Sequence, residues 1–299
     1  MTGSTGIFRN QSARECMQQW YDRFLDRLPP PAARTTIDTR CGSTHVLVYG
    51  PPDAPPLLCL HGAVAGAPHA LYEVRGLLDR YRVYAPDIVG QSVASAEVRP
   101  RFDAEGFGGW AQDVVRGLGL SRTHVMGVSW GGSVALQLAV HAPALVDRLV
   151  LLVSAGLVAG SPWQALVKVG WPMLRWRLRP TREHLEALLS ANLTTLDPMW
   201  VGFMGDAFRS VKMDFSAPPL VGDDDLRGFD RPTMLIAAEH DLSFPAKAML
   251  TRASALFPNL VQTHVIEGSK HCPPFEDEFR GWLCERIQCF LDRELSAAA

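Results

Sequence analysis

The residues best suited to covalent chemistry form a Gly-x-Ser-x-Gly pattern at 127–131, with Ser129 at its centre. The sequence predicts a strand before this pattern, at 123–127, and a helix after it, at 131–141. A serine on a sharp turn between a strand and a helix exposes its hydroxyl in a strained backbone conformation. The glycines on either side let the strand and the helix approach each other. The pattern therefore predicts that Ser129 is a nucleophile.

A serine hydroxyl becomes a good nucleophile when a base takes its proton, and a carboxylate must orient that base. Downstream of Ser129, Asp241 follows a predicted strand and His271 follows the next one. Both side chains are expected in loops at the carboxyl ends of strands, where α/β enzymes place their sites. Asp241 is preferred to Glu239 because it lies further out of its strand. The predicted triad is Ser129, Asp241 and His271.

His271 is preferred to the other eight histidines as the base. His240 precedes Asp241 on the same turn and is expected to point away from it. A second place for an acid, after the strand that ends at Val153, is occupied by Ser154. Six histidines stand in surface-like or helix-end contexts and are expected to be solvated: His45, His69, His124, His141, His184 and His264.

The ninth histidine, His61, begins a second motif, HGAVAGA at 61–67, after a predicted buried strand. A loop at this place can present a backbone N–H to the carbonyl oxygen of a substrate, beside the N–H of the residue that follows the nucleophile. These two donors are assigned to Ala63 and Trp130. One such donor changes the rate by about 10²–10³-fold.

The elements that position these motifs alternate in type. Strands are predicted at 45–49, 56–60, 81–85, 123–127, 149–153, 233–238 and 261–266, and helices at 108–118, 131–141 and 279–291. This alternation indicates βαβ units and a mostly parallel sheet with helices on both faces. Residues 155–228 break the rhythm with helical stretches rich in Trp and Met, and they are expected to form a helical cap inserted after the sixth strand. The core is then 41–154 and 229–299.

Residues 1–40 are expected to be an N-terminal helical extension. Apolar residues recur there at helical spacing before a run of three prolines ends the helix: Met17, Trp20, Tyr21, Phe24, Leu25 and Leu28. This face could bind a partner or a membrane, but we expect it to pack on its own domain.

Taken together, these motifs resemble the α/β-hydrolase superfamily over about residues 40–292. The segments that carry the resemblance are LLCLHGAVAGA, VYAPDIVGQSVAS, HVMGVSWGGSVALQLA, TMLIAAEHDLSFP and IEGSKHCPPFE, in this order. The chain looks most like single-cap bacterial carboxylesterases, with proline iminopeptidases and carbon–carbon bond hydrolases as neighbours. The resemblance implies acyl-enzyme chemistry without a metal or cofactor, in which Ser129 attacks an ester carbonyl. His271 then protonates the leaving group and later activates water.

The cap is expected to supply an apolar substrate pocket, because Trp and Met fill irregular hydrophobic space. The predicted lining is Val64, Trp163, Trp171, Trp176, Met199, Trp200 and Met204. The same Trp and Met residues could instead form the core of the cap. A basic run is expected on a solvated face rather than as a clamp for a carboxylate: Arg175, Arg177, Arg179 and Arg182.

The expected activity is hydrolysis of carboxylic esters of small to medium apolar acids. A carbon–carbon bond hydrolase or an aminopeptidase of the same fold remains open, as do a non-hydrolytic ligand receptor and an acyltransferase. A net charge of −2 gives no electrostatic reason to expect nucleic acid or an anionic membrane as partner. The expected partners are a small-molecule ester and water, and the protein is expected to be a monomer or homodimer. Six cysteines without a metal-binding pattern and an N-terminus without a secretory signal predict a cytoplasmic location.

Overall fold

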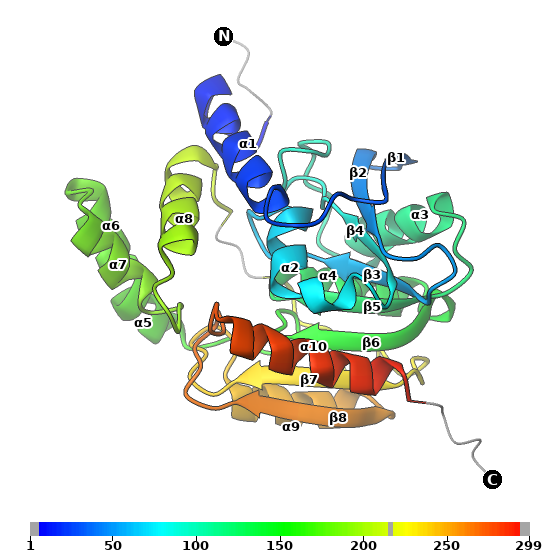
Figure 1. The fold of residues 1–299 in the computed structure, drawn as a ribbon. Helices are drawn as coiled ribbons and strands as arrows, with labels where there is room; N and C mark the ends of the chain where they lie inside the picture. The colour runs from blue at the N-terminus through cyan, green and yellow to red at the C-terminus, as the bar shows by residue number, and fades with distance from the viewer. Residues whose placement is uncertain (1–5, 215–217, 294–299) are drawn as a thin grey trace.

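A computed structural model describes residues 6–214 and 218–293, in which eight strands form one sheet (Figure 1). Their order across the sheet is β1-β2-β4-β3-β5-β6-β7-β8. The strands are β1 (Ala33–Thr39), β2 (Gly42–Tyr49), β3 (Pro56–Leu60), β4 (Arg82–Pro86), β5 (Thr123–Val128), β6 (Val146–Leu152), β7 (Thr233–Ala238) and β8 (Leu260–Ile266). β2 pairs antiparallel with both β1 and β4. The remaining neighbours in this order, from β4 through β3 to β8, all pair parallel. The predicted mostly parallel sheet is confirmed.

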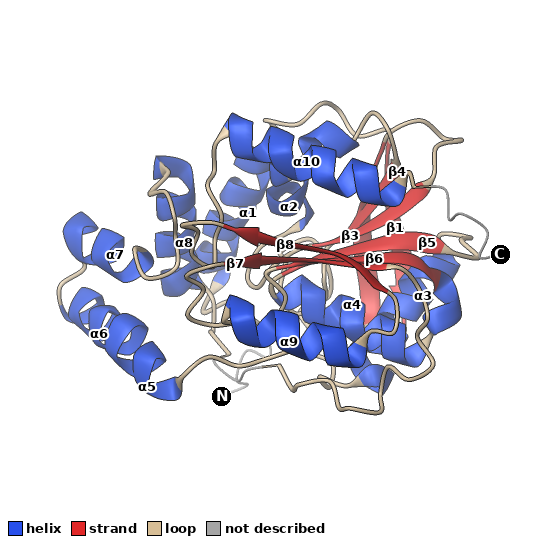
Figure 2. Cartoon of the chain, turned by 90° about the horizontal axis from the view of Figure 1, so that it is seen from below, coloured by secondary structure: helices blue, strands red, loops and turns tan. Residues whose placement is uncertain are grey.

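Helices cover both faces of this sheet, as Figure 2 shows. One face carries α2 (Ala67–Glu73) and α10 (Asp277–Leu291), and the other carries α3 (Gly109–Gly117), α4 (Trp130–His141) and α9 (Ala246–Leu256). Strands β5 and β7 are buried nearly throughout because both of their faces are covered, and their near-continuous apolar sequences fit that position. No helix in the described part of the chain is long and apolar enough to cross a bilayer.

Between β6 and β7 the chain leaves the sheet and forms the inserted helices α5 (Pro162–Ala165), α6 (Trp171–Leu178), α7 (Arg182–Leu189) and α8 (Pro198–Ser210). A π-helical turn at 166–170 joins α5 to α6 without a break. The tips of β6, β7 and β8 point toward these helices, which lie together at one end of the molecule (Figures 1 and 2).

The first helix, α1 (Gln11–Leu25), packs against α8 and α2. Its buried residues are Met17, Trp20, Tyr21 and Phe24. The Trp20 indole N–H also donates to Asp206 Oδ2 on α8 at 2.9 Å. The apolar face of α1 therefore packs within this chain.

Within the expected N-terminal extension, β1 pairs with β2 along its whole length and so belongs to the sheet. Ile37 is the only buried residue of β1. Thr, Arg and Asp fill most other positions of this edge strand, so its sequence lacks the apolar alternation by which strands are predicted.

Candidate active site

Ser129 stands on the turn between β5 and α4 with φ of 52° and ψ of −116°. A positive φ is strained for a residue with a side chain. A Cβ at Gly127 would lie 2.5 Å from the carbonyl oxygen of Gly131, and a Cβ at Gly131 would lie 2.4 Å from that of His61. The two flanking glycines are thus required by the close approach of the strand, the turn and the helix.

Three side chains from separate loops meet at this turn. Ser129 Oγ lies 2.9 Å from His271 Nε2, and His271 Nδ1 lies 2.7 Å from Asp241 Oδ2. The Asp241 carboxylate is fully buried, and its Oδ1 accepts hydrogen bonds from the amides of Ser243 and Phe244. These bonds fix the carboxylate so that it can hold the proton of the imidazole on Nδ1. The Nε2 atom is then free to accept the proton of Ser129.

The competing carboxylate lies elsewhere. Glu239 Oε2 accepts a hydrogen bond from the Gly268 amide at 2.8 Å, and its side chain is 49% exposed. His240 beside it is also exposed and does not contact the Ser129 hydroxyl. The geometry thus brings together Ser129, His271 and Asp241 and leaves Glu239 outside.

The loop 61–67 runs beside the nucleophile, and a Cβ on Gly62 would stand 3.8 Å from Ser129 Cβ. The Ala63 amide makes no hydrogen bond to any described residue. The Trp130 amide is the first of α4 and therefore has no acceptor within its helix. Two backbone donors are thus available near Ser129 for a negatively charged oxygen.

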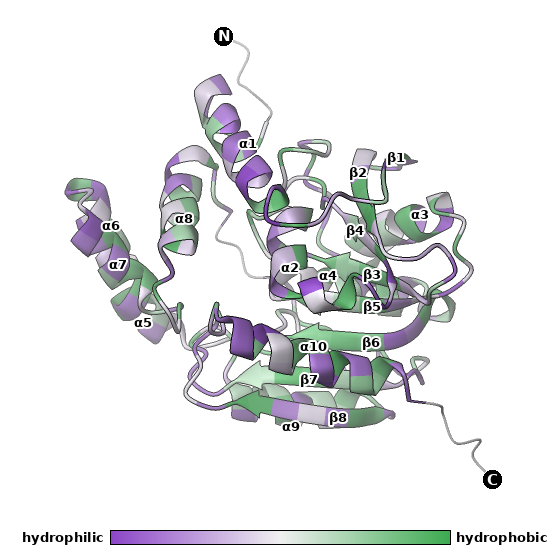
Figure 3. Ribbon diagram, viewed as in Figure 1, coloured by the Kyte–Doolittle hydropathy of each residue, from purple (hydrophilic) through white to green (hydrophobic). Residues whose placement is uncertain are grey.

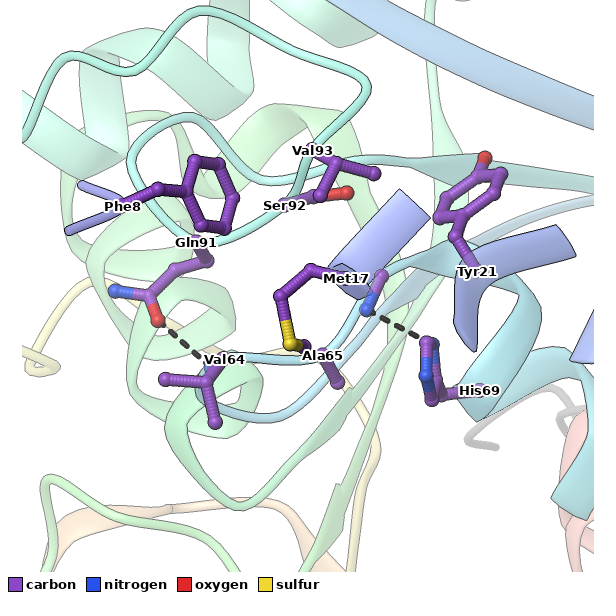
Figure 4. A pocket seen from close by; sticks show the side chains of 10 residues that line it. Phe8, Met17, Tyr21, Val64, Ala65, His69, Gln91, Ser92 and Val93 are labelled. Carbon is purple, nitrogen blue, oxygen red and sulfur yellow. Dashed lines mark hydrogen bonds between the residues drawn. The ribbon is translucent and has the colours of Figure 1, made fainter. Parts of the chain in front are cut away.

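Buried polar contacts hold this loop in place. His61 Nε2 accepts a hydrogen bond from the Ile88 amide at 2.8 Å, while its Nδ1 lies 2.8 Å from the Gly62 carbonyl oxygen. Burial lowers the pKa of His61, which keeps the ring neutral and able to accept from Ile88. Val64, at a strained φ of 52°, donates its amide to Gln91 Oε1 at 2.9 Å (Figure 4).

Asp87 anchors the far end of the loop. Its carboxylate accepts hydrogen bonds from the Ala67 amide, the Ser92 hydroxyl and the Tyr21 hydroxyl at 2.7–2.8 Å, and it lies 2.9 Å from His45 Nδ1. Burial alone would raise the pKa of Asp87, but these partners, led by His45, outweigh burial and hold that pKa below its usual range. Asp87 therefore ties α1, β2 and the start of α2 to one point behind the loop.

A cavity of about 440 Å³ opens beside Ser129 and His271. The loop 62–65 borders it on one side and α7 and α8 on the other. Its lining is mostly apolar and includes three residues that the sequence predicts there, Val64, Trp200 and Met204. It also includes residues that the sequence analysis missed: Leu189, Leu193, Phe203, Phe208, Met213 and Phe275.

The α/β hydrolase fold family matches residues 55–225 of this sequence, which is more than half of the chain. The chain belongs to the α/β-hydrolase family. Carboxylesterase YbfK of Bacillus subtilis is 27% identical over 291 residues, covering 91% of this chain and 92% of its own length. An uncharacterized carboxylesterase, nap, of the same organism is 27% identical over 287 residues, covering 92% of each chain.

Solved structures agree with this assignment. The structure of naproxen esterase (carboxylesterase NP) from Bacillus subtilis matches with a TM-score of 0.78 and 23% identity, covering 95% of this chain and 100% of that chain. The structure of carboxylesterase CesB (YbfK) from the same organism matches with a TM-score of 0.77 and 24% identity, covering 94% of this chain and 99% of that chain. At these identities the structures establish the shared α/β-hydrolase fold.

In this α/β hydrolase, four residues predicted for the pocket do not line the cavity. Trp163 and Trp171 are 70% and 60% exposed on the inserted helices. Trp176 is buried against Phe208, and Met199 packs at the edge of the cluster formed by α1, α7 and α8. The prediction is corrected for all four, because Trp and Met content does not reveal which face of a helix points toward the sheet.

Two ionisable side chains, one partly buried and one buried, line the cavity away from the triad, and they lie one helical turn apart on α2. The first, Glu73, accepts hydrogen bonds from Arg280 Nε at 2.9 Å and from the Trp200 indole N–H at 3.1 Å. Burial raises the pKa of Glu73, while Arg280 opposes this shift. The spacing of four residues, which puts both side chains on one face of a helix, was the available sequence signal.

The second is His69, which the sequence analysis expects to be solvated. It is only 3% exposed, and its ring lies between those of Phe24 and Phe203, with centroids 4.2 and 4.3 Å away. Its Nδ1 accepts a hydrogen bond from the Gly66 amide at 3.1 Å (Figure 4). Burial lowers the pKa of His69 to about 3, so the ring is neutral and carries its proton on Nε2. The expectation of a solvated His69 is wrong.

A cysteine thiol, Cys272, adjoins the triad and lines the same cavity. Burial, reinforced by the negative charges of Asp241 and Glu73, raises the pKa of Cys272 to about 12. The thiol therefore stays protonated and is a poor nucleophile. Among the described residues, no group of three or more His, Cys, Asp or Glu side chains could hold a metal ion.

Proposed function

We propose that this chain is a carboxylesterase-type serine hydrolase that cleaves esters of small to medium apolar carboxylic acids through an acyl-enzyme intermediate. The observation that carries the proposal is the chain of contacts from Ser129 through His271 to the buried Asp241, at the edge of an apolar cavity. Similarity over more than nine-tenths of the chain to two Bacillus subtilis carboxylesterases supports an ester as the substrate.

In the first half of the proposed reaction, Ser129 Oγ attacks the ester carbonyl while His271 Nε2 takes its proton. Asp241 accepts the hydrogen bond from Nδ1 and stabilises the imidazolium. The amides of Ala63 and Trp130 donate to the oxyanion, and each such donor contributes about 10²–10³-fold to the rate. His271 then gives its proton to the departing alkoxide, which leaves an acyl group on Ser129.

In the second half, a water molecule replaces the alcohol. His271 takes a proton from this water as its oxygen attacks the acyl carbonyl, and the two amides again stabilise the oxyanion. Collapse of the intermediate returns the proton to Ser129 and releases the carboxylic acid. Every step uses side chains and amides of this chain together with water, so the proposed reaction has no cofactor.

We infer that residues 155–228 act as a cap over a core formed by 41–154 and 229–299, to which β1 adds an edge strand from the extension. In support, α7, α8 and the segment between them contribute lining residues to the cavity, including Leu193 and Trp200. The extension 1–40 contributes α1 to the same side, because α1 packs on α8. We further propose that the protein is a monomer or homodimer. We also propose a cytoplasmic location, where cysteines remain reduced, because all six cysteines are free.

A panel of p-nitrophenyl esters of increasing acyl length tests the proposal, with a meta-cleavage dienoate and a proline arylamide as competing substrates. We expect turnover of the esters and at least a 10³-fold loss of kcat in Ser129→Ala, with an unchanged circular dichroism spectrum. Near-normal ester hydrolysis by Ser129→Ala would overturn the mechanism. Faster turnover of the dienoate or the arylamide than of any ester would overturn the substrate class.

A further inference from the structure

An exposed apolar stripe runs along the continuous helix 162–178, which α5, the π-helical turn and α6 build together. Six large apolar side chains are exposed on it, and they recur every three or four residues along most of its length, the spacing that places residues on one helix face. We call them the outer stripe: Trp163, Leu166, Val167, Trp171, Leu174 and Leu178.

The outer stripe is not needed for the packing of this chain, because the helix already has a buried face. Trp176 is 3% exposed and packs on Phe208 of α8, and α6 lies against α7. The helix lies at the outer end of the molecule, away from the sheet (Figures 1 and 2). An exposed apolar face of this kind on a helix that is otherwise packed indicates an interaction surface.

Basic side chains flank the outer stripe. Lys168, Arg175, Arg177 and Arg179 are all exposed, and no Asp or Glu occurs from 161 to 182. Arg175 approaches the His184 ring at 3.3 Å, whereas the other three make no ion pair with any described residue. At 3.6 residues per turn, Arg175 lies about 40° from Trp171 on one side of the stripe and Arg177 about 60° from Leu174 on the other. Figure 3 shows hydrophobic and hydrophilic residues side by side along α6.

We propose that the outer stripe docks on an anionic phospholipid surface, with helix 162–178 lying in the plane of the interface. Trp and Leu side chains enter the boundary between head groups and acyl chains, and the basic side chains reach the phosphates. The whole-chain charge of −2 does not oppose this contact, because the basic side chains are gathered on one helix and charges beyond about 10 Å are screened. The inference goes beyond the proposed esterase activity and does not depend on it.

A second copy of this chain fits the outer stripe less well. A two-fold interface places the same patch on both partners, so it would gather the basic side chains of two copies, with no acidic residue between 161 and 182 to neutralise them. An anionic lipid surface matches both the apolar stripe and its basic flanks.

Docking at this helix would also bring the cavity near the lipid. Three residues, 179–181, separate α6 from α7, and Leu189 at the end of α7 lines the cavity. The docking helix and one side of the cavity thus belong to the same group of inserted helices. Esters dissolved in the membrane would then lie close to the proposed catalytic serine.

Sedimentation with sucrose-loaded vesicles tests the inference with the full chain. We expect binding to vesicles of equal parts phosphatidylcholine and phosphatidylglycerol and weak binding to phosphatidylcholine alone. Each basic residue near an anionic surface contributes about fivefold to partitioning, so the triple variant Arg175→Gln/Arg177→Gln/Arg179→Gln should lose roughly a hundredfold. The double variant Trp163→Ser/Trp171→Ser should lose at least tenfold.

Matched controls use exposed residues outside the helix. The double variants Leu220→Ser/Val261→Ser and Arg101→Gln/Arg227→Gln should bind vesicles like the wild type. The triple Arg→Gln variant and the double Trp→Ser variant should hydrolyse soluble p-nitrophenyl acetate at the wild-type rate, and Ser129→Ala should still bind vesicles. Failure of the docking inference can therefore be distinguished from failure of the esterase proposal.

Three results would overturn the docking inference. The first is a wild-type protein that binds neither vesicle at low salt. The second is equal vesicle binding by the wild type, the triple Arg→Gln variant and the double Trp→Ser variant. The third is a wild-type dimer, detected by light scattering, that Trp163→Ser/Trp171→Ser converts to a monomer, since the outer stripe would then be a subunit interface.

Discussion

His69 should make the stability of this fold depend on pH, because it is buried as a neutral ring. Its side chain is enclosed by Phe24 and Phe203, and the Gly66 amide donates to Nδ1. Burial first, and the nearby His61 second, lower the pKa of His69 from its ordinary value of 6.5 to about 3, although Asp87 opposes the shift. Protonation would place a charge in a buried site between two aromatic rings, where the loss of solvation outweighs the attraction of Asp87.

The sign follows from which state binds more protons. Between pH 6.5 and about 3 the unfolded chain protonates His69 while the folded chain does not. The stability contributed by the neutral ring is therefore fully present above pH 6.5 and is lost as pH falls toward 3. One pKa unit corresponds to about 1.4 kcal/mol, so lowering the pH from about 8 to about 5 should remove about 2 kcal/mol of unfolding free energy.

Urea unfolding followed by tryptophan fluorescence measures this loss in the wild type and in His69→Asn. Asn can still accept from the Gly66 amide but does not titrate. The variant should be less stable at pH 8 because it leaves space between the two phenylalanine rings. Its difference from the wild type should shrink by about 2 kcal/mol at pH 5, because His61 and the carboxylates titrate in both proteins and cancel.

His240→Asn, a substitution of an exposed ring, is the control and should keep the wild-type dependence on pH. A stability difference between the wild type and His69→Asn that stays constant from pH 8 to pH 5 would refute the reasoning. In that case the folded protein would protonate His69 as readily as the unfolded chain does.

Two further predictions concern the proposed active site. Asp241→Asn should lower kcat on p-nitrophenyl acetate by roughly 10⁴-fold, because an amide no longer holds His271 in the required tautomer. Glu239→Gln should change kcat by less than about threefold. A large loss in Glu239→Gln and a small one in Asp241→Asn would mean that Glu239 is the acid of the triad. Met204→Ala should move the preferred acyl chain toward longer esters, since each buried methylene contributes about 0.8 kcal/mol, and Trp163→Ala should leave the kcat/KM profile unchanged. Identical profiles for Met204→Ala and the wild type would mean that α8 does not select the acyl group.

The predicted triad residues come together because local rules position each of them. The turn at Ser129 needs glycines at fixed positions, and those positions are visible in the sequence. Asp241 and His271 follow strands that run parallel to β5, so their loops must emerge at the same edge of the sheet. Short-range patterns and the parallel arrangement together predict this part of the candidate site.

The pocket lining could not be predicted in the same way, because it depends on how the inserted helices are rotated. The helix 162–178 carries Trp163 and Trp171 on one face and Trp176 on the other, and only packing against α7 and α8 decides which face is buried. The burial of His69 could not be predicted for a related reason. Its environment is made by Phe24 and Phe203, which are distant from it in sequence.

These distant contacts meet at α1, which therefore has a larger role than a terminal extension. Trp20 donates to Asp206 on α8, Phe24 packs on His69, and Tyr21 donates to the Asp87 carboxylate that also holds the start of α2. One face of α1 thus joins the inserted helices to the buried network behind the loop 61–67. A continuous series of contacts therefore runs from α8 through α1 and Asp87 to the loop that carries the Ala63 amide.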